Sequence, residues 1–249
     1  GHGFYEGASI RKIGGIYYFI YSSVNNHELC YATSRYPDRE FRYRGVIVSN
    51  GDVGIAGRRE SERLNHTGTT HGSIECINGR WYVFYHRQTH GTDYSRQACA
   101  EPIVILPDGS IPQVEITSCG LNGAPLAGEG TYPAVICCNL TDGHMPHGGN
   151  ASFKDIPMIT HDKDERFLAG LKQGTQIVYK YFDLSDATCV YLMLRGKGRI
   201  ASGSSWTEVD SANSKQYVLP LQDRSARRAL RFQVLQGELE MLSLRFEKG

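Results

Sequence analysis

The sequence predicts an all-β protein, in which a partial β-propeller is followed by a β-sandwich of the jelly-roll type. The chain of 249 residues contains 15 Tyr, 9 Phe and 28 Gly, and few of its stretches have a helical period, which favours strands. A β-hairpin pattern at the start of the chain also returns 64 positions later. Beyond about residue 150 the rhythm changes to short strand-like runs with turns between them, which is typical of a β-sandwich.

The overall composition indicates a packed protein without long-range charge attraction. Hydrophobic residues make up 40% and charged residues 21% of the chain, so disorder is not expected. The net charge of +1 gives no pull toward nucleic acid or a membrane surface. No run of 18 apolar residues occurs, so we expect neither a nucleic-acid nor a membrane partner.

The seven cysteines are odd in number, and no pair of them has a metal-ligand spacing. We interpret them as reduced thiols, which predicts a reducing compartment and a cytoplasmic rather than secreted protein. The cysteines stand at positions 30, 76, 99, 119, 137, 138 and 189.

The first unit of the chain reads as four strands. Residues 4–21 hold two strand-forming runs joined by Gly14-Gly15, and Gly-Gly between such runs is a two-residue hairpin signal. Further strands are expected over 28–34 and 43–49. The stretch 50–70 is charged, contains glycine and has no period, so it predicts a long loop.

The opening pattern returns from His71 onward. After it, strands are expected over 95–106 and 111–117, with a turn at 107–110. Each unit therefore carries about four strands, the size of a propeller blade. A propeller needs at least four blades to close, so the two units and their closing segment predict a partial propeller. The matched pairs are Ser9 with Ser73, Ile10 with Ile74, Ile13 with Ile77, Gly15 with Gly79, Tyr17 with Trp81 and Tyr21 with Tyr85.

The second half begins after a stretch rich in Gly, Pro and His over 128–149, which predicts a linker. We place the domain boundary so that residues 1–145 form the partial propeller and residues 146–249 the β-sandwich. The sandwich strands are expected over 177–184, 189–195, 197–202, 216–221, 229–235 and 238–246.

Glu6 is the carboxylate that the first hairpin singles out. A carboxyl beside Phe4 and Tyr5 that is partly desolvated would have a raised pKa and would suit a general acid. From these residues alone, a solvated glutamate at a strand start is the more ordinary interpretation. The histidines at 66, 71, 86 and 90 have no zinc-motif spacing, and all except His71 are interpreted as ordinary polar residues.

Three motifs in order resemble glycoside hydrolase family 43, and the last hundred residues are similar to a family 6 carbohydrate-binding module. The first resemblance implies a five-bladed β-propeller with β-xylosidase, α-L-arabinofuranosidase or arabinanase activity. The motifs are Glu6-Gly7-Ala8-Ser9 before a hairpin, His71-Gly72-Ser73, and Arg96-Gln97-Ala98-Cys99-Ala100-Glu101-Pro102 near Asp108-Gly109-Ser110-Ile111; the second resemblance rests on residues 179–183 and Trp206.

The resemblance implies roles for particular residues. Glu6 matches the general acid of an inverting enzyme, whose second carboxylate activates water as general base. Arg96 matches an arginine that reaches into the sugar pocket. His71 matches a histidine near the propeller axis, which in some members helps to hold a calcium ion or a water; no cofactor is required. Glu101 is expected to be a charge partner of Arg96.

Trp206 follows the loop-like run Gly203-Ser204-Ser205. Its ring either stacks on a sugar, as a substrate-binding residue, or packs in the sandwich core. The binding module usually ends with an asparagine that contacts ligand, and Glu240 stands there in this chain. This difference weakens the expectation of binding at that cleft.

The chain departs from the family in one decisive respect. The general base and a third carboxylate come from earlier blades, and only five residues precede Glu6. We therefore expect the C-terminal portion of an enzyme for oligosaccharides or polysaccharides containing arabinose or xylose, with little activity alone and with self-association or a missing N-terminal partner segment. The alternative is a non-catalytic carbohydrate-binding or assembly protein that keeps the blades as a scaffold.

Overall fold

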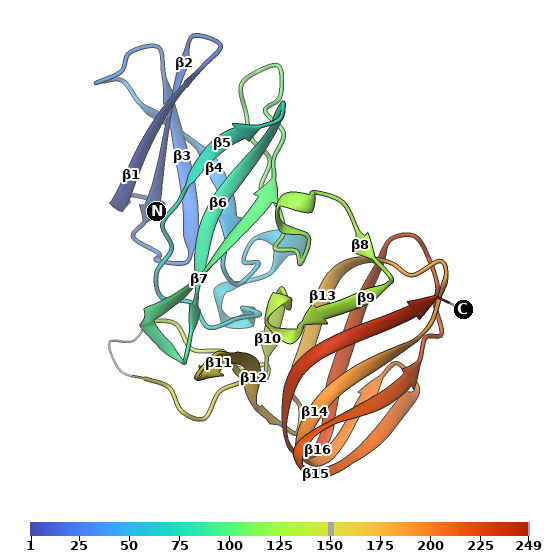
Figure 1. The fold of residues 1–249 in the computed structure, drawn as a ribbon. Coiled ribbons are helices and arrows are strands. Elements are labelled where there is room, and N and C mark those ends of the chain that lie inside the picture. Colours follow the sequence, from blue (N-terminus) through green and yellow to red (C-terminus); the bar gives the residue numbers. More distant parts are fainter. Residues whose placement is uncertain (149–151, 249) are drawn as a thin grey trace.

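The computed structural model describes residues 1–148 and 152–248 and confirms an all-β protein (Figure 1). The first sheet is an antiparallel meander of β1 (Phe4–Ile13), β2 (Ile16–Ser23), β3 (Glu28–Ser34) and β4 (Arg42–Ser49). The second sheet consists of β5 (Ser73–Ile77), β6 (Arg80–Thr89) and β7 (Thr92–Pro102). The sheets do not close into a ring, which fits a partial propeller.

Tight turns explain why the two sheets share a sequence pattern. Two-residue hairpins of type I′ require a positive φ at both turn residues. Glycine, asparagine and, less often, histidine adopt this conformation at low cost. The turn residues and their φ angles are Gly14 (55°) and Gly15 (80°), Asn78 (51°) and Gly79 (79°), and His90 (58°) and Gly91 (64°).

The predicted loop over residues 50–70 contains the short 3-10 turns η1 (Ile55–Gly57) and η2 (Glu60–Glu62). The predicted strand over 111–117 is wrong. This segment leaves β7 and runs along the first sheet, where Val114 N–H donates to Ile47 O at 2.9 Å and Val114 forms an isolated parallel bridge with Val48. The second sheet therefore has three strands instead of the expected four.

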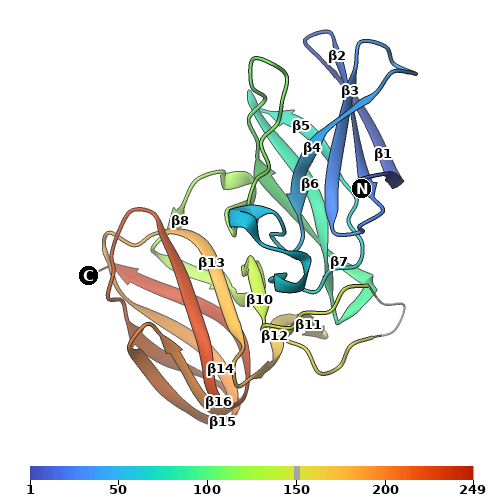
Figure 2. The same cartoon turned by 180° about the vertical axis from the view of Figure 1, so that it is seen from behind.

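The second half of the chain folds as a β-sandwich (Figures 1 and 2). Its longest strand, β16, pairs with four others: β9, β12, β13 and β14. A large apolar core lies between the layers, with Phe182, Phe232 and Phe246 among its buried rings. The strands after residue 152 are β11 (Met158–Asp162), β12 (Glu165–Lys172), β13 (Gln176–Asp183), β14 (Ala187–Ser202), β15 (Ser205–Pro220) and β16 (Arg228–Lys248).

Two pairs of predicted sandwich strands are single strands in the structure. The runs 189–195 and 197–202 both lie in β14, and the runs 229–235 and 238–246 both lie in β16. The glycine between the two runs of each pair, Gly196 or Gly237, was interpreted as a turn residue. In the structure these glycines have φ angles of 116° and 76°. Gly196 instead sits at a register shift in the β14–β15 pairing, where a glycine accommodates a bulge. Strands β11 and β12 were not predicted.

The predicted linker over 128–149 is wrong for much of its length. Two short strands, β9 (Gly130–Pro133) and β10 (Asn139–Thr141), lie within it and pair with β16 and β13 of the sandwich, and β8 (Leu126–Ala127), just before it, pairs with β13. The glycine and proline content predicted an irregular backbone. In the structure, backbone groups of this segment instead form hydrogen bonds with strands of the sandwich. The boundary at 145/146 stays a prediction, and Gly149 lies outside the described residues.

The two halves share buried contacts. Cys138 and Val178 pack in the same apolar cluster as Tyr31 and Ile47 of the first sheet. The Lys180 ammonium group of β13 lies 3.1 Å from Asp52 Oδ2 and 2.9 Å from Glu115 Oε2. The blades and the sandwich are therefore joined by a common core and by a largely buried ion cluster.

In the part of the chain that the structure describes, no helix has the length and apolar character needed to cross a bilayer.

Candidate active site

Glu6 and His71 meet where the first sheet faces the second. The Nε2 atom of His71 lies 2.9 Å from Glu6 Oε1, and the side chains are 37% and 46% exposed. The expected desolvation by neighbouring aromatics is not seen, because Phe4 packs on Phe19 and Tyr21 while nearly half of the Glu6 side chain faces solvent. The carboxyl is thus accessible to a ligand and oriented by an imidazole.

Irregular backbone places Glu6. The pairing of β1 with β2 shifts register on both sides of this residue, and such bulges re-aim side chains next to active sites. Gly7 follows with a φ of +71°, and a Cβ added there would lie 2.9 Å from His71 Cδ2. Only glycine lets the β1 backbone approach the imidazole so closely.

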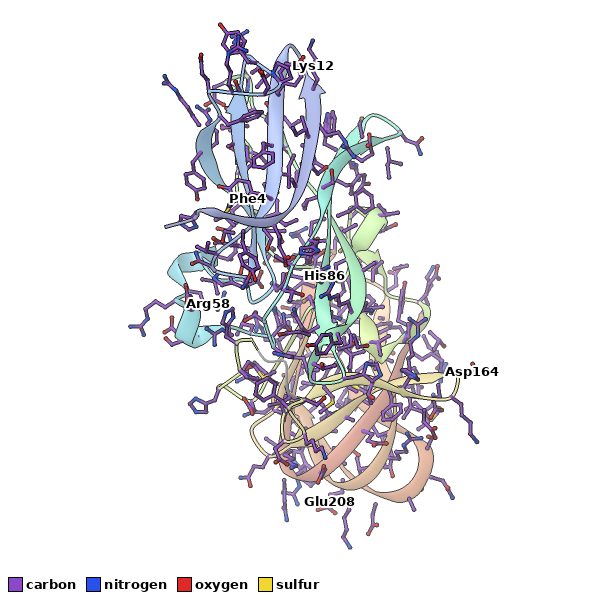
Figure 3. All side chains as sticks on the ribbon, turned by 90° about the vertical axis from the view of Figure 1, so that its left-hand side faces the viewer. Phe4, Lys12, Arg58, His86, Asp164 and Glu208 are labelled. Carbon is purple, nitrogen blue, oxygen red and sulfur yellow. The ribbon has the colours of Figure 1, made fainter. Side chains whose placement is uncertain are left out.

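His86 of β6 contacts both the backbone and the ring of His71, a role that was not predicted from the sequence. The backbone N–H of His71 donates to His86 Nδ1 at 3.3 Å, and the rings meet edge-to-face with centroids 5.5 Å apart. Because Nδ1 is an acceptor, Nε2 carries the proton and donates to Thr69 Oγ1 at 3.0 Å. Figure 3 shows this side of the molecule, with His86 on β6 and Phe4 on β1.

Burial keeps His86 uncharged. Loss of hydration, followed by the positive charge of Arg96 and the neighbouring His71 ring, lowers the pKa of His86 to about 4. A neutral imidazole can accept at one nitrogen while it donates at the other. The alternation of side chains along β6 could have revealed this position. His86 lies two residues before Gln88, which pairs with Arg96, so His86 and Arg96 lie on the same face of the β6–β7 pair.

Arg96 lies on β7 opposite Gln88, with its side chain exposed. Its Nε–H donates to the carbonyl of Asp93 at 2.9 Å, and its charge acts on His86. The structure thus brings Arg96 to the edge of the Glu6–His71–His86 group without a hydrogen bond to Glu6. The guanidinium is left available for a ligand beside that group.

Glu101 is not the charge partner of Arg96. It is 1% exposed and accepts hydrogen bonds from Thr117 N–H at 2.7 Å and from Tyr85 O–H at 3.2 Å. Burial raises the pKa of its carboxyl to about 8. Its sequence position beside Pro102 did not reveal that β7 turns this side chain inward.

Among the described residues, His71 belongs to no cluster of three metal-ligand side chains. The one such group joins His2, Glu28 and Cys30, and there the Glu28 Oε1 atom already accepts from Ser23 O–H at 2.6 Å and Asn25 Nδ2–H at 2.9 Å. A calcium site at His71 would need oxygen ligands from other chain segments.

Trp206 lies in β15 of the sandwich, remote from the Glu6 group along the fold (Figure 1). Its ring is 54% exposed, so it does not belong to the sandwich core. The Arg199 guanidinium covers one ring face at 4.3 Å. The ring borders a surface hollow of about 430 Å³ that is also lined by Gln176 and Arg231. Glu240, by contrast, is engaged in an ion pair with Arg195.

The chain is similar to known proteins over much of its length. No family model matches the chain. It is 47% identical over 218 residues to a xylosidase/arabinosidase of Thermoclostridium stercorarium, covering 83% of this chain and 46% of that protein. It is 38% identical over 85 residues to a β-xylosidase of Xylanibacter ruminicola, covering 34% of this chain and 22% of that protein.

A solved structure shares the fold over nearly the whole chain. It is a glycoside hydrolase family 43 arabinoxylan arabinofuranohydrolase from Bacillus subtilis, with a TM-score of 0.50 and 17% identity, over 99% of this chain and 54% of that one. The chain thus spans about half the length of the Thermoclostridium relative and of this structure.

Proposed function

Because the chain belongs to glycoside hydrolase family 43, we propose that it is part of an inverting glycosidase whose β-sandwich is similar to a family 6 carbohydrate-binding module. The substrates are oligosaccharides of plant polysaccharides that contain arabinose or xylose, as the names of the sequence relatives suggest. The observation that carries the proposal is the Glu6–His71 contact of 2.9 Å, which presents an accessible carboxyl at the meeting of two sheets.

Glu6 acts as the general acid in this proposal. It protonates the glycosidic oxygen while a second carboxylate activates a water on the other face of the sugar, about 6.5–9.5 Å away. His71 holds the acid in place through its ring N–H, and neutral His86 fixes the His71 backbone. Arg96 donates to sugar hydroxyls beside the acid. The base is supplied by the part of the relatives that this sequence does not represent.

The experiment measures turnover of 4-nitrophenyl α-L-arabinofuranoside and β-D-xyloside. The chain alone should be nearly inactive, and activity should appear when it is co-expressed with the part of the Thermoclostridium relative outside the matched region. Glu6→Gln should abolish that activity, and Glu75→Gln, at an exposed site on β5, should not. Turnover of about 1 s⁻¹ or more by the chain alone would contradict the missing base.

A second candidate function is carbohydrate binding without catalysis. The exposed Trp206 ring beside a polar hollow favours it, because an aromatic face stacks on the C–H groups of a sugar. Calorimetric titration with xylo-oligosaccharides tests it, with Trp206→Ala as the variant and Val218→Ala on the same strand as the control. Binding by the chain without turnover in the complemented complex would favour this function.

We also propose that the exposed apolar side chains of the first sheet take part in association, either with a second copy or with the remaining blades. Exposed apolar patches mark interaction sites. Light scattering at micromolar concentration tests self-association, and a monomer would count against it. The side chains are Phe4, Tyr5, Ile10, Val24, Tyr36 and Tyr43.

For the location we propose the cytoplasm. All seven cysteines are free thiols in the structure, which suits a reducing compartment.

A further inference from the structure

Three side chains with metal-ligand atoms meet outside the candidate active site, beside β3. His2, Glu28 and Cys30 bring one nitrogen, one oxygen and one sulfur atom within 4.8 Å of one another. His2 Nδ1 lies 2.6 Å from Glu28 Oε1, and Cys30 Sγ lies 3.4 Å from the same oxygen. Glu28 and Cys30 are two positions apart on one strand, so their side chains point to the same face. These three residues are called the His2–Glu28–Cys30 cluster below.

Both the backbone and the ring of His2 are held in place. Tyr21 O–H donates to His2 O at 2.8 Å, and Val24 N–H donates to Gly3 O at 2.9 Å. The imidazole stacks on the Tyr43 ring of β4, with centroids 5.1 Å apart and an angle of 7° between the planes. The segment before β1 therefore lies against the first sheet (Figures 1 and 2), and its imidazole is already directed at the carboxylate.

Glu28 is oriented by neighbours that would remain in place around a bound metal ion. The residue is buried, and its Oε1 atom accepts from Ser23 O–H at 2.6 Å and from Asn25 Nδ2–H at 2.9 Å. In metal sites, hydrogen bonds of this kind orient the ligating carboxylates. Cys30 is also buried, whereas 42% of the His2 side chain is exposed. The cluster thus has a fixed inner side and a solvent-facing side through which an ion can enter.

The kinds of donor atom in the cluster favour zinc. Zinc binds thiolate sulfur, imidazole nitrogen and carboxylate oxygen at about 2.0–2.3 Å, usually in tetrahedral geometry. Ligand atoms on one such ion lie about 3–4 Å apart, which is close to the separations of 2.6 and 3.4 Å already present. Calcium and magnesium prefer oxygen ligands, so a sulfur and a nitrogen among three donors disfavour both ions.

We propose that the His2–Glu28–Cys30 cluster binds one zinc ion, with a water molecule as the fourth ligand on the exposed side of His2. Binding replaces the hydrogen bonds of His2 and Cys30 to Glu28 Oε1 and releases the thiol proton to solvent, because a coordinating thiol is deprotonated. The ion tethers the segment before β1 to β3, and it thereby fixes the start of the strand that carries Glu6. The inference goes beyond the proposed function and does not depend on it.

The test uses the full chain, freed of metal with a chelator and then titrated with zinc or with cobalt(II) as a spectroscopic probe. Calorimetry should show one zinc ion per chain, and cobalt(II) should give a thiolate-to-metal charge-transfer band together with the d–d bands of a tetrahedral site. His2→Ala and Cys30→Ser should each weaken zinc binding at least about tenfold, and Cys30→Ser should remove the charge-transfer band. His144→Ala and Cys76→Ser, at exposed positions, are the matched controls and should change neither readout.

Thermal unfolding gives a second readout that does not need the buried cysteine to be replaced. A ligand that binds only the folded state raises its stability, so zinc should raise the Tm of the wild type and of His144→Ala but not that of His2→Ala. Circular dichroism of the metal-free variants checks that each one folds, and the exposed His2→Ala carries the test if Cys30→Ser does not fold.

Several results would overturn the proposal. They are the absence of zinc binding by the wild type, bound cobalt(II) without a charge-transfer band, and equal zinc affinities for His2→Ala and His144→Ala. Zinc binding that survives in a folded Cys30→Ser variant but is lost in His2→Ala would place the ion on the start of the chain alone, which also contradicts the proposal. None of these measurements depends on turnover, so their outcome is separate from that of the proposed function.

Discussion

At the scale of single residues, the position of Glu6 depends on two nearby glycines that have no side chain, Gly7 and Gly72. Gly7 brings the backbone against the His71 ring, and Gly72 lets β5 approach β6 so closely that an added Cβ would lie 1.8 Å from Phe84 O. His71 is held between these close approaches and the His86 ring. Precise placement of the carboxyl depends on supporting contacts of this kind.

Gly7→Ala should destabilise the chain and displace His71. The new methyl group would lie 2.9 Å from His71 Cδ2 at a φ of +71°, so both a clash and backbone strain arise. Gly14→Ala is the matched control, because its φ is also positive and nothing lies within 4 Å of the added Cβ. Urea unfolding should show a loss about 1 kcal/mol or more greater for Gly7→Ala; equal losses would contradict the contact.

Glu101 should make stability fall as pH rises. Burial raises the pKa of its carboxyl from 4.5 to about 8 in the folded chain. Between these values the unfolded chain releases a proton that the folded chain retains, so the free energy of unfolding decreases by up to about 1.4 kcal/mol per pH unit. Below pH 4.5 both states are protonated and this effect vanishes.

The measurement is urea unfolding of the wild type and Glu101→Gln at pH 5 and pH 8. Glutamine keeps the acceptor for Thr117 N–H and Tyr85 O–H and can donate to Thr117 Oγ1. Its stability should change less between the two pH values than that of the wild type. Glu75→Gln, at an exposed position, should follow the wild type. Parallel curves for Glu101→Gln and the wild type would refute the assignment.

At the scale of elements, one arginine fastens the second sheet to the sandwich. Arg87 of β6 is buried and donates to Val135 O in η4 (Ala134–Ile136) at 2.9 Å and to Gln97 Oε1 of β7 at 2.9 Å. These bonds connect β6, β7 and η4. Arg87 and Gln97 also line a cavity of about 330 Å³ beside β7.

Arg87→Met should cost about 2–4 kcal/mol of unfolding free energy, because it removes the buried hydrogen bonds from a charged donor to Val135 O and Gln97 Oε1. Arg80→Met on the same strand is the control, since Arg80 is exposed and makes one long bond to Gly123 O at 3.4 Å. Chemical denaturation checks both. Equal effects would show that the bonds to Val135 and Gln97 contribute no stability.

At the scale of the whole molecule, Lys180 connects three separate segments. Its ammonium group contacts Asp52 and Glu115, while Asp52 also accepts from Ile116 N–H at 2.7 Å and Asn139 Nδ2–H at 3.0 Å. Buried charges of this kind stabilise only as a complete set. We expect the blades and the sandwich to unfold together for this reason.

Lys180→Met should leave the carboxylates of Asp52 and Glu115 without the ammonium group. It should lower the free energy of unfolding by about 3–5 kcal/mol and separate the unfolding of the two halves. Differential scanning calorimetry should then show two transitions in place of one. Lys172→Met, which removes an exposed pair with Asp155, should keep a single transition. A single transition for Lys180→Met would mean that the shared apolar cluster suffices for coupling.

Much of the first half could be predicted because its signals are local. Gly14-Gly15 and Asn78-Gly79 identify hairpins through the φ angles that their turns require. The sandwich was less predictable, because Gly196 and Gly237 lie within long strands instead of in turns, and Gly196 accommodates a register shift. Residues 111–117 have strand composition, but their partner is β4, which no local pattern reveals.

The sequence by itself determined the all-β class, the repeated hairpins and the family resemblance, since these depend on turn chemistry, residue period and short motifs. Only the tertiary structure decided that His86 supports His71, that Glu101 is buried on Thr117, and that Lys180 joins the halves. These facts depend on contacts between residues 15 or more positions apart. Such contacts follow from how the sheets pack, and packing is a property of the whole chain.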